Sequence, residues 1–72
     1  MEKLDKKSFL ILFGNNLRNA REAKGYTQQQ LADELGIEIS QISRIERGVI
    51  NTTVATLFAI CKVLQISSAD LM

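Results

Sequence analysis

The side chains best suited to specific chemistry lie in the stretch EISQISRIER, from Glu38 to Arg47. This stretch is rich in amide, hydroxyl and guanidinium groups, which form directional hydrogen bonds. A guanidinium such as that of Arg44 can donate two parallel hydrogen bonds to O6 and N7 of a guanine base. The composition of the stretch therefore favours a helix that lies in a DNA major groove.

The sequence lacks the residues that enzymatic catalysis and metal binding commonly need. The chain contains no histidine, a single cysteine (Cys61) and no glycine-rich phosphate loop. A single thiol excludes an internal disulfide framework and a multi-cysteine zinc site, and the missing histidine removes the commonest general base. Cys61 lies in an apolar stripe without a neighbouring cation, which is typical of a small buried side chain. We therefore expect no enzymatic activity, no metal or other cofactor and no small-molecule ligand.

Length and composition indicate one compact domain over residues 1–72. The chain has 72 residues, of which 46% are hydrophobic, and this is sufficient for a single core. The apolar run from Phe9 to Phe13 is too short for a membrane span or a signal peptide, which indicates a cytoplasmic protein without a membrane partner. The net charge of +1 gives no independent support for nucleic-acid binding. Only the local pair Arg44 and Arg47 supplies a small positive face.

A helix is expected directly before the polar stretch. Thr27 and Gln30 have the spacing of a capping box, in which each side chain binds the backbone amide of the other residue. Gly36 stands where a residue in the left-handed conformation commonly ends a helix. The pattern predicts a helix over residues 28–35.

A second short helix is expected to carry the polar stretch itself. It would cover about residues 39–47, bury Ile42 and Ile45, and end at Gly48. Because so few residues separate the two helices, they must cross steeply, and the small side chain of Ala32 allows the close approach. Residues 28–47 thus form one unit that presents a polar face.

Hydrophobic periodicity predicts three further helices and therefore an all-α domain of five helices. The expected boundaries are Ser8 to about Lys24 for the first helix, a start after Thr52 or Thr53 for the fourth, and a start after Ser67 for a fifth that carries Leu71 and Met72. Residues 1–7 are expected to be frayed. Gly14 costs the first helix roughly 1 kcal/mol relative to alanine, unless a neighbouring helix needs the close approach.

The sequence TQQQLADELGIEISQISRIERG resembles the helix-turn-helix of the XRE-like family, the phage repressor and Cro type of bacterial DNA-binding domain. The matching features are Gln28, Ala32, Gly36, Ile42 and the terminal sequence IERG. The similarity extends from about residue 13 to residue 72. It implies a compact repressor-like fold and double-stranded DNA as the partner.

The resemblance also implies a role for individual side chains at matching positions. The base-reading positions are Ile39, Ser40, Gln41 and Arg44. The expected phosphate contacts come from Thr27, Gln28, Ser43, Arg47, Asn51 and Thr52. Arg21 and Glu46 are expected to form a structural ion pair that joins the first helix to the end of the recognition helix.

Several of these roles have an alternative. Ile39 would either touch a thymine methyl group or belong to the core. Gln28 could be a surface glutamine that merely favours helix, and Arg44 could be solvated or bound to a phosphate. Glu38 is expected to be solvated, because a carboxylate beside DNA phosphates is unfavourable unless it accepts from a cytosine amine.

A single module of this size buries a small DNA interface, so the geometry and the family imply a homodimer on a palindromic operator. The candidate dimer contacts are Phe9, Leu12, Phe58, Leu71 and Met72. For Phe9 and Leu12, a place in the core is an equal alternative. The function expected from the resemblance is sequence-specific transcriptional regulation, and in particular repression.

Two other functions remain open from the sequence. The chain could be an antitoxin or another protein-interaction module that binds a protein partner and regulates its own gene through DNA. It could also be the DNA-binding end of a longer protein.

Overall fold

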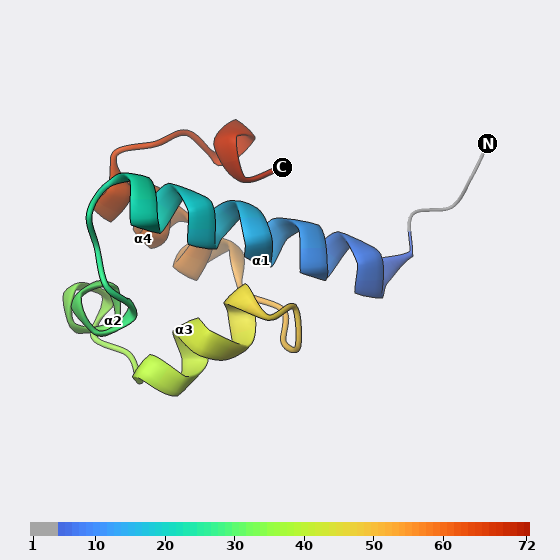
Figure 1. The fold of residues 1–72 in the computed structure, drawn as a ribbon, viewed down its shortest axis with the longest axis horizontal. Coiled ribbons are helices and arrows are strands. Elements are labelled where there is room, and N and C mark those ends of the chain that lie inside the picture. The colour runs from blue at the N-terminus through green and yellow to red at the C-terminus, as the bar shows by residue number, and fades with distance from the viewer. Residues whose placement is uncertain (1–4) are drawn as a thin grey trace.

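The computed structural model describes residues 5–72, which contain four α-helices and one short 3₁₀ helix (Figure 1). The helices are α1 (Lys6–Ala23), α2 (Gln28–Leu35), α3 (Ile39–Glu46), α4 (Val54–Leu64) and the 3₁₀ helix η1 (Ser68–Leu71). The expected all-α class is confirmed. The expected fifth α-helix is wrong, because this segment is closed by the tighter i→i+3 bonds from Asp70 N to Ser67 O and from Met72 N to Ala69 O.

The first helix begins earlier than the sequence indicated. It starts at Lys6 instead of Ser8, with Asp5 at the N-cap position: the Asp5 carbonyl accepts from Phe9 N at 2.9 Å, and its carboxylate accepts from the Ser8 hydroxyl at 3.1 Å instead of from a backbone amide. Of the stretch predicted to be frayed, residues 1–4 lie outside the described part of the chain.

The capping box of α2 is present with both of its hydrogen bonds. Gln30 N donates to Thr27 Oγ1 at 3.0 Å, and Thr27 N donates to Gln30 Oε1 at 2.9 Å. At the other end Gly36 has a φ of 70°, a conformation that costs residues with a side chain free energy. The local chemistry of the sequence therefore sets both ends of α2.

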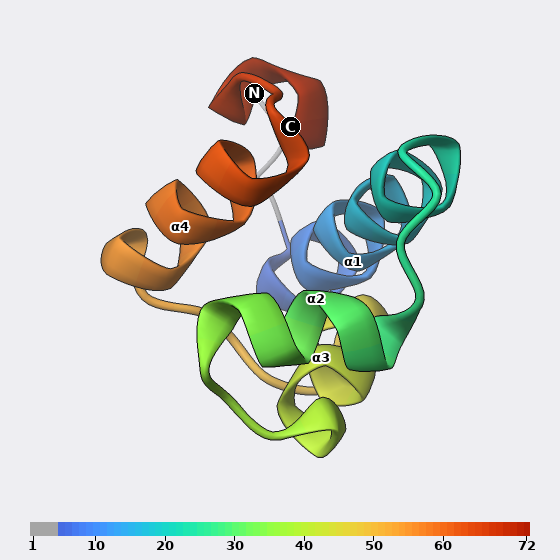
Figure 2. The same cartoon turned by 90° about the vertical axis from the view of Figure 1, so that its left-hand side faces the viewer.

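The core lies between α1 and the other helices. α1 packs against α3 and η1, while α2 packs against α3 and α4 (Figures 1 and 2). The buried hydrophobic residues are Phe13, Leu17, Leu31, Ala32, Ile42, Ile45, Ile60, Cys61, Leu64 and Leu71. Burial raises the pKa of the Cys61 thiol, which keeps the sulfur in its protonated, weakly nucleophilic form at neutral pH.

Gly14 is the point at which α1 crosses the end of α3. A Cβ atom at this position would overlap the main-chain carbonyl oxygens of Ile45 and Glu46. The glycine therefore allows the close approach that fixes α3 relative to α1. Within residues 5–72 no helix is both long and apolar enough to cross a lipid bilayer.

Candidate nucleic-acid interface

The outward face of α3 carries the polar side chains that the sequence marked for base recognition. Ser40, Gln41 and Arg44 are exposed, whereas Ile42 and Ile45 are buried on the opposite side. This separation follows from helical periodicity, because residues three and four positions apart share a face.

Ile39 lies at the first position of α3 and is 41% exposed. The alternative that placed this side chain in the core is therefore wrong, because Ile39 is neither buried nor packed against the hydrophobic core. An exposed aliphatic side chain at this position is able to contact a thymine methyl group. Glu38, directly before it, is also exposed.

Arg44 in α3 and Arg47, which directly follows α3, differ in their partners. Arg47 Nε donates to the carbonyl of Ser43 at 3.4 Å, and Ser43 is itself half-buried. Among residues 5–72, no carboxylate forms an ion pair with Arg44. The guanidinium of Arg44 therefore has no ion-pair partner among these residues and is able to bind a separate molecule.

The start of α2 supplies a second set of donors near α3. The first amides of a helix, here those of Gln28 and Gln29, have no carbonyl acceptor within the helix and lie at the positive end of its dipole. Thr27 Oγ1 accepts from Gln30 N, but its hydroxyl proton can still be donated. These groups have the chemistry of an anion site at a helix N-terminus.

A buried ion pair ties this region to α1. Arg21 Nε donates to Glu46 Oε2 at 2.6 Å and Arg21 Nη2 donates to Glu46 Oε1 at 3.1 Å, so the pair is bidentate. Arg21 Nη1 also donates to the carbonyl of Tyr26 at 2.7 Å. The hydrogen bond to Glu46 raises the pKa of Arg21 above its ordinary value, so the guanidinium stays charged.

Gln28 extends this network, which the sequence did not indicate. Its Nε2 atom donates to Glu46 Oε1 at 2.9 Å and its side chain is partly buried. One amide proton is thus used inside the protein, and the second remains able to donate outward. No spacing rule foretells a contact between residues from different helices, so only the packing of α2 on α3 reveals it.

Asn51 and Thr52 follow α3 in the connection to α4. Asn51 is exposed, and its Oδ1 atom accepts from Thr52 N at 2.9 Å, so its Nδ2 atom can still donate to a phosphate. Thr52 is half-buried. Of the two threonines considered as the cap of α4, Thr53 takes this role, with Oγ1 accepting from Thr56 N at 3.1 Å.

The candidate dimer residues fall into different environments. Leu71 is fully buried, and its carbonyl accepts from Asn16 Nδ2 at 3.2 Å, so its assignment as a dimer contact is wrong. The tight turn of η1 directs the Leu71 side chain into the core. Phe9 is half-buried and stacks on Phe13 with ring centroids 6.5 Å apart. The remaining candidates are exposed: Leu12, Phe58 and Met72.

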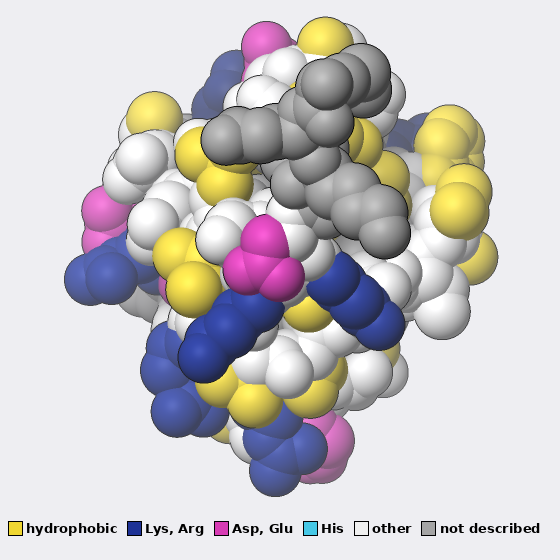
Figure 3. Space-filling view, turned by 90° about the vertical axis from the view of Figure 1, so that its right-hand side faces the viewer, with side chains coloured by type: hydrophobic (Ala, Val, Ile, Leu, Met, Phe, Trp, Pro, Cys, Tyr) yellow, Lys and Arg dark blue, Asp and Glu magenta, His cyan; other side chains and the backbone are white. Residues whose placement is uncertain are grey.

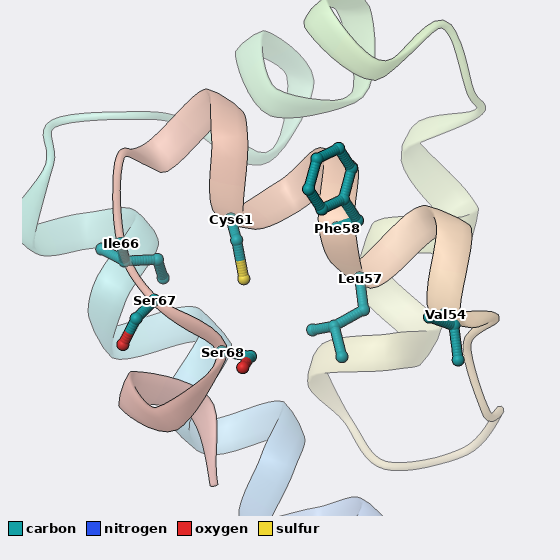
Figure 4. A pocket seen from close by; sticks show the side chains of 7 residues that line it. All are labelled: Val54, Leu57, Phe58, Cys61, Ile66, Ser67 and Ser68. Carbon is teal, nitrogen blue, oxygen red and sulfur yellow. The ribbon is translucent and has the colours of Figure 1, made fainter.

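An apolar pocket of about 390 Å³ lies between α4 and the segment that leads into η1 (Figure 4). Leu57 and Cys61 extend from α4 towards the side on which Ser67 and Ser68 lie. Phe58 and Val54 also line it and are 66% and 82% exposed. This surface is an apolar region of α4 that the rest of the described chain leaves uncovered.

Residues 17–71 match the HTH_3 family, which is described as helix-turn-helix. Among solved structures, the restriction-modification controller protein C.AhdI from Aeromonas hydrophila is 32% identical, with a TM-score of 0.85 over 90% of this chain and 98% of that protein. The biofilm master regulator SinR, solved in complex with DNA, is 32% identical, with a TM-score of 0.76 over 82% of this chain and 98% of SinR. Antitoxin HipB from Escherichia coli K12 is 38% identical over 74% of this chain and 60% of HipB.

Proposed function

This chain belongs to the HTH_3 helix-turn-helix family of DNA-binding transcriptional regulators, and we propose that it represses transcription by occupying a palindromic operator as a homodimer. The observation that carries the proposal is the outward face of α3, where Arg44 is exposed without an ion-pair partner among residues 5–72. A side chain that reads DNA bases must be exposed and free to form hydrogen bonds before DNA binds.

The dimensions of α3 support its placement in the major groove. An α-helix with its side chains is about 10–12 Å in diameter, which is close to the width of the major groove of B-DNA, about 12 Å. In this arrangement Arg44, Ser40, Gln41 and Ile39 face the base edges. The α2 amides, Thr27 and Gln28 then face one phosphate strand.

The connection after α3 would contact the same DNA at its backbone. Arg47 and the side-chain amide of Asn51 are exposed donors, and Ser43 and Thr52 are half-buried beside them. Such contacts fix the register of the protein on the duplex but carry no sequence information directly. Sequence preference is therefore assigned to the start and middle of α3.

A homodimer is supported by the exposed apolar surface on α4. Phe58 and Val54 flank the pocket beside η1, and Met72 is 58% exposed. A second copy of the chain would remove these side chains from water, which favours association. Two copies related by a two-fold axis would place their α3 helices about 34 Å apart, one turn of the DNA helix.

Selection of bound duplexes from a random DNA pool at near-physiological salt tests this proposal. The expected result is enrichment of a palindrome whose half-sites are about one helical turn apart. Sedimentation of the protein with the selected duplex should show two chains per site. Enrichment of no sequence, or of a single half-site bound by one chain, would contradict the proposed operator complex.

An antitoxin is the second candidate function, because antitoxin HipB is 38% identical to this chain over 74% of its length. In this case the main partner is a protein, and DNA binding serves to regulate the antitoxin's own gene. Co-expression with the products of neighbouring genes distinguishes the two. A stoichiometric complex with one such product would favour the antitoxin, and isolation of the chain alone would favour the operator-binding regulator.

A further inference from the structure

We propose that a groove between the start of α1 and the segment after α3 binds a backbone phosphate of the DNA and so extends the interface beyond the helix-turn-helix. The inference rests on the proposed DNA-binding function. The groove has a volume of about 610 Å³. Its cationic side chains are those of Lys6, Lys7 and Arg47, and its apolar lining includes Leu10, Ile11 and Val49.

The charge of the groove suits an anionic ligand. Among the described residues 5–72, its lining contains three cations and one carboxylate, that of Asp5, which already accepts a hydrogen bond from Ser8 Oγ at 3.1 Å. Within residues 5–72, neither Lys6 nor Lys7 forms an ion pair. In Figure 3, which views the molecule from this side, Lys and Arg side chains flank hydrophobic atoms near the centre and lower part of the face.

The position of the two lysines is unfavourable in the isolated chain. They occupy the first turn of α1, where the helix dipole is positive; this turn contains no acidic residue, and the one carboxylate beside it among residues 5–72 in the groove is that of Asp5 at the N-cap. Cations at a helix N-terminus are repelled by the dipole, whereas anions are stabilised there. A phosphate bound between Lys6, Lys7 and Arg47 would offset this repulsion, so the bound state is electrostatically favoured over the free one.

The groove is held next to the end of the recognition helix. A Cβ atom on Gly48 would come within 2.8 Å of the Ile11 Cα atom, so the backbones of α1 and the α3–α4 connection are in close contact. Arg47 directly follows α3 and lies three residues after Arg44. When α3 occupies the major groove, the phosphate strands pass at its two ends, and one of them passes beside this groove.

The salt dependence of DNA binding tests the assignment. Binding of the full chain to the selected duplex and to an unrelated duplex is measured between 50 and 200 mM salt for the wild type and for the double variant Lys6→Gln/Lys7→Gln. Loss of one phosphate contact in each of the two half-sites should reduce the slope of log K against log salt by about 1.8, so the affinity advantage of the wild type shrinks about twelvefold over this range. The ratio of affinities for the two duplexes should stay unchanged.

The control is Lys24→Gln, which removes one exposed positive charge at the opposite end of α1 and should leave the slope unchanged. Thermal melting should show that all variants are folded, because Lys6 and Lys7 are exposed. Ethylation interference should identify one phosphate per half-site whose ethylation weakens binding of the wild type but not of the double variant.

Three outcomes would overturn the proposal. Equal slopes of log K against log salt for the wild type and the double variant would show that the groove binds no phosphate, while leaving the proposed function intact. A change of oligomeric state on sedimentation, with an unchanged slope, would assign the groove to a contact between two copies of the chain. A wild-type protein that binds no duplex would overturn the proposed function together with this inference.

Discussion

Arg21 packs against the inner side of α3, and Arg44 lies on its outer side, so one short helix separates two arginines with opposite roles. Arg21 is 7% exposed and donates to both carboxylate oxygens of Glu46 and to the carbonyl of Tyr26. Arg44 is exposed and forms no ion pair with residues 5–72. Residue type alone therefore does not assign a role; burial and existing partners decide which arginine stabilises the fold and which can bind a ligand.

The largest expected effect concerns the inner side. Arg21→Ala should lower the free energy of unfolding by ~3–5 kcal/mol, because it leaves the Glu46 carboxylate buried without its partner. Chemical denaturation of the wild type and the variant measures this difference. The control is Arg18→Ala, since the Arg18–Glu22 pair is exposed and its loss should change stability by less than about 1 kcal/mol. An unchanged stability of Arg21→Ala would show that the buried pair is not what holds α1 to α3.

The second prediction concerns the helix crossing that keeps the inner side closed. Gly14→Ala should destabilise the protein by about 1–3 kcal/mol, because the added methyl group overlaps carbonyl oxygens at the end of α3. Asn15→Ala is the control: the neighbouring side chain is exposed, so alanine there should only improve helix propensity. Thermal melting of both variants distinguishes the steric effect from the intrinsic preference for alanine in a helix. Equal stabilisation of both would mean that the helices separate at little cost.

The third prediction concerns the outer side. Arg44→Ala should leave the melting temperature within experimental error and relax the preference at one base pair by about 1–3 kcal/mol. Binding to the selected operator and to its single-base variants measures this loss of discrimination. Lys24→Ala, which removes an exposed cation at the end of α1, is the control for net charge. If Arg44→Ala weakens every sequence equally, Arg44 binds a phosphate and the base-reading assignment is wrong.

Sequence reasoning recovered the parts of this molecule that local chemistry determines. The bounds of α2 follow from Thr27, Gln30 and Gly36, whose conformational preferences act within a few residues. The buried stripe of α4 follows from helical periodicity in the same way. The resemblance to a known family pointed to Arg21 and Glu46, which are 25 residues apart in the chain.

What the sequence did not reveal depends on contacts between elements. The reach of Gln28 to Glu46, the burial of Leu71 and the exposure of Ile39 all depend on how helices pack, which no local pattern specifies. The capping contact expected from the spacing of Ser67 and Asp70 does form, because Ser67 N donates to Asp70 Oδ2 at 3.0 Å, yet the segment is a 3₁₀ turn that brings Leu71 into the core. The capping signal therefore marked where the helix begins but not which type of helix so short a segment forms.

The smallest expected effect lies where the inner and outer sides of α3 meet, at Gln28. Gln28→Ala removes a donor to a DNA phosphate and the hydrogen bond to Glu46 Oε1. We expect affinity to fall about tenfold for specific and unrelated duplexes alike, as for loss of one hydrogen bond to a charged group, and stability to fall by roughly 1 kcal/mol. Titration of both duplexes and thermal melting measure the two effects.

Gln29→Ala is the control for this last prediction, because Gln29 stands next to Gln28 but its Nε2 atom donates to Asp33 Oδ1 at 2.8 Å on the surface of α2. It should change binding and stability less than Gln28→Ala does. If both variants bind DNA like the wild type, the backbone amides of α2 hold the phosphate without help from either side chain. If Gln28→Ala loses stability but keeps its affinity for DNA, Gln28 acts only in the buried network with Glu46 and does not bind a phosphate. The inner and outer sides of α3 would then share no residue.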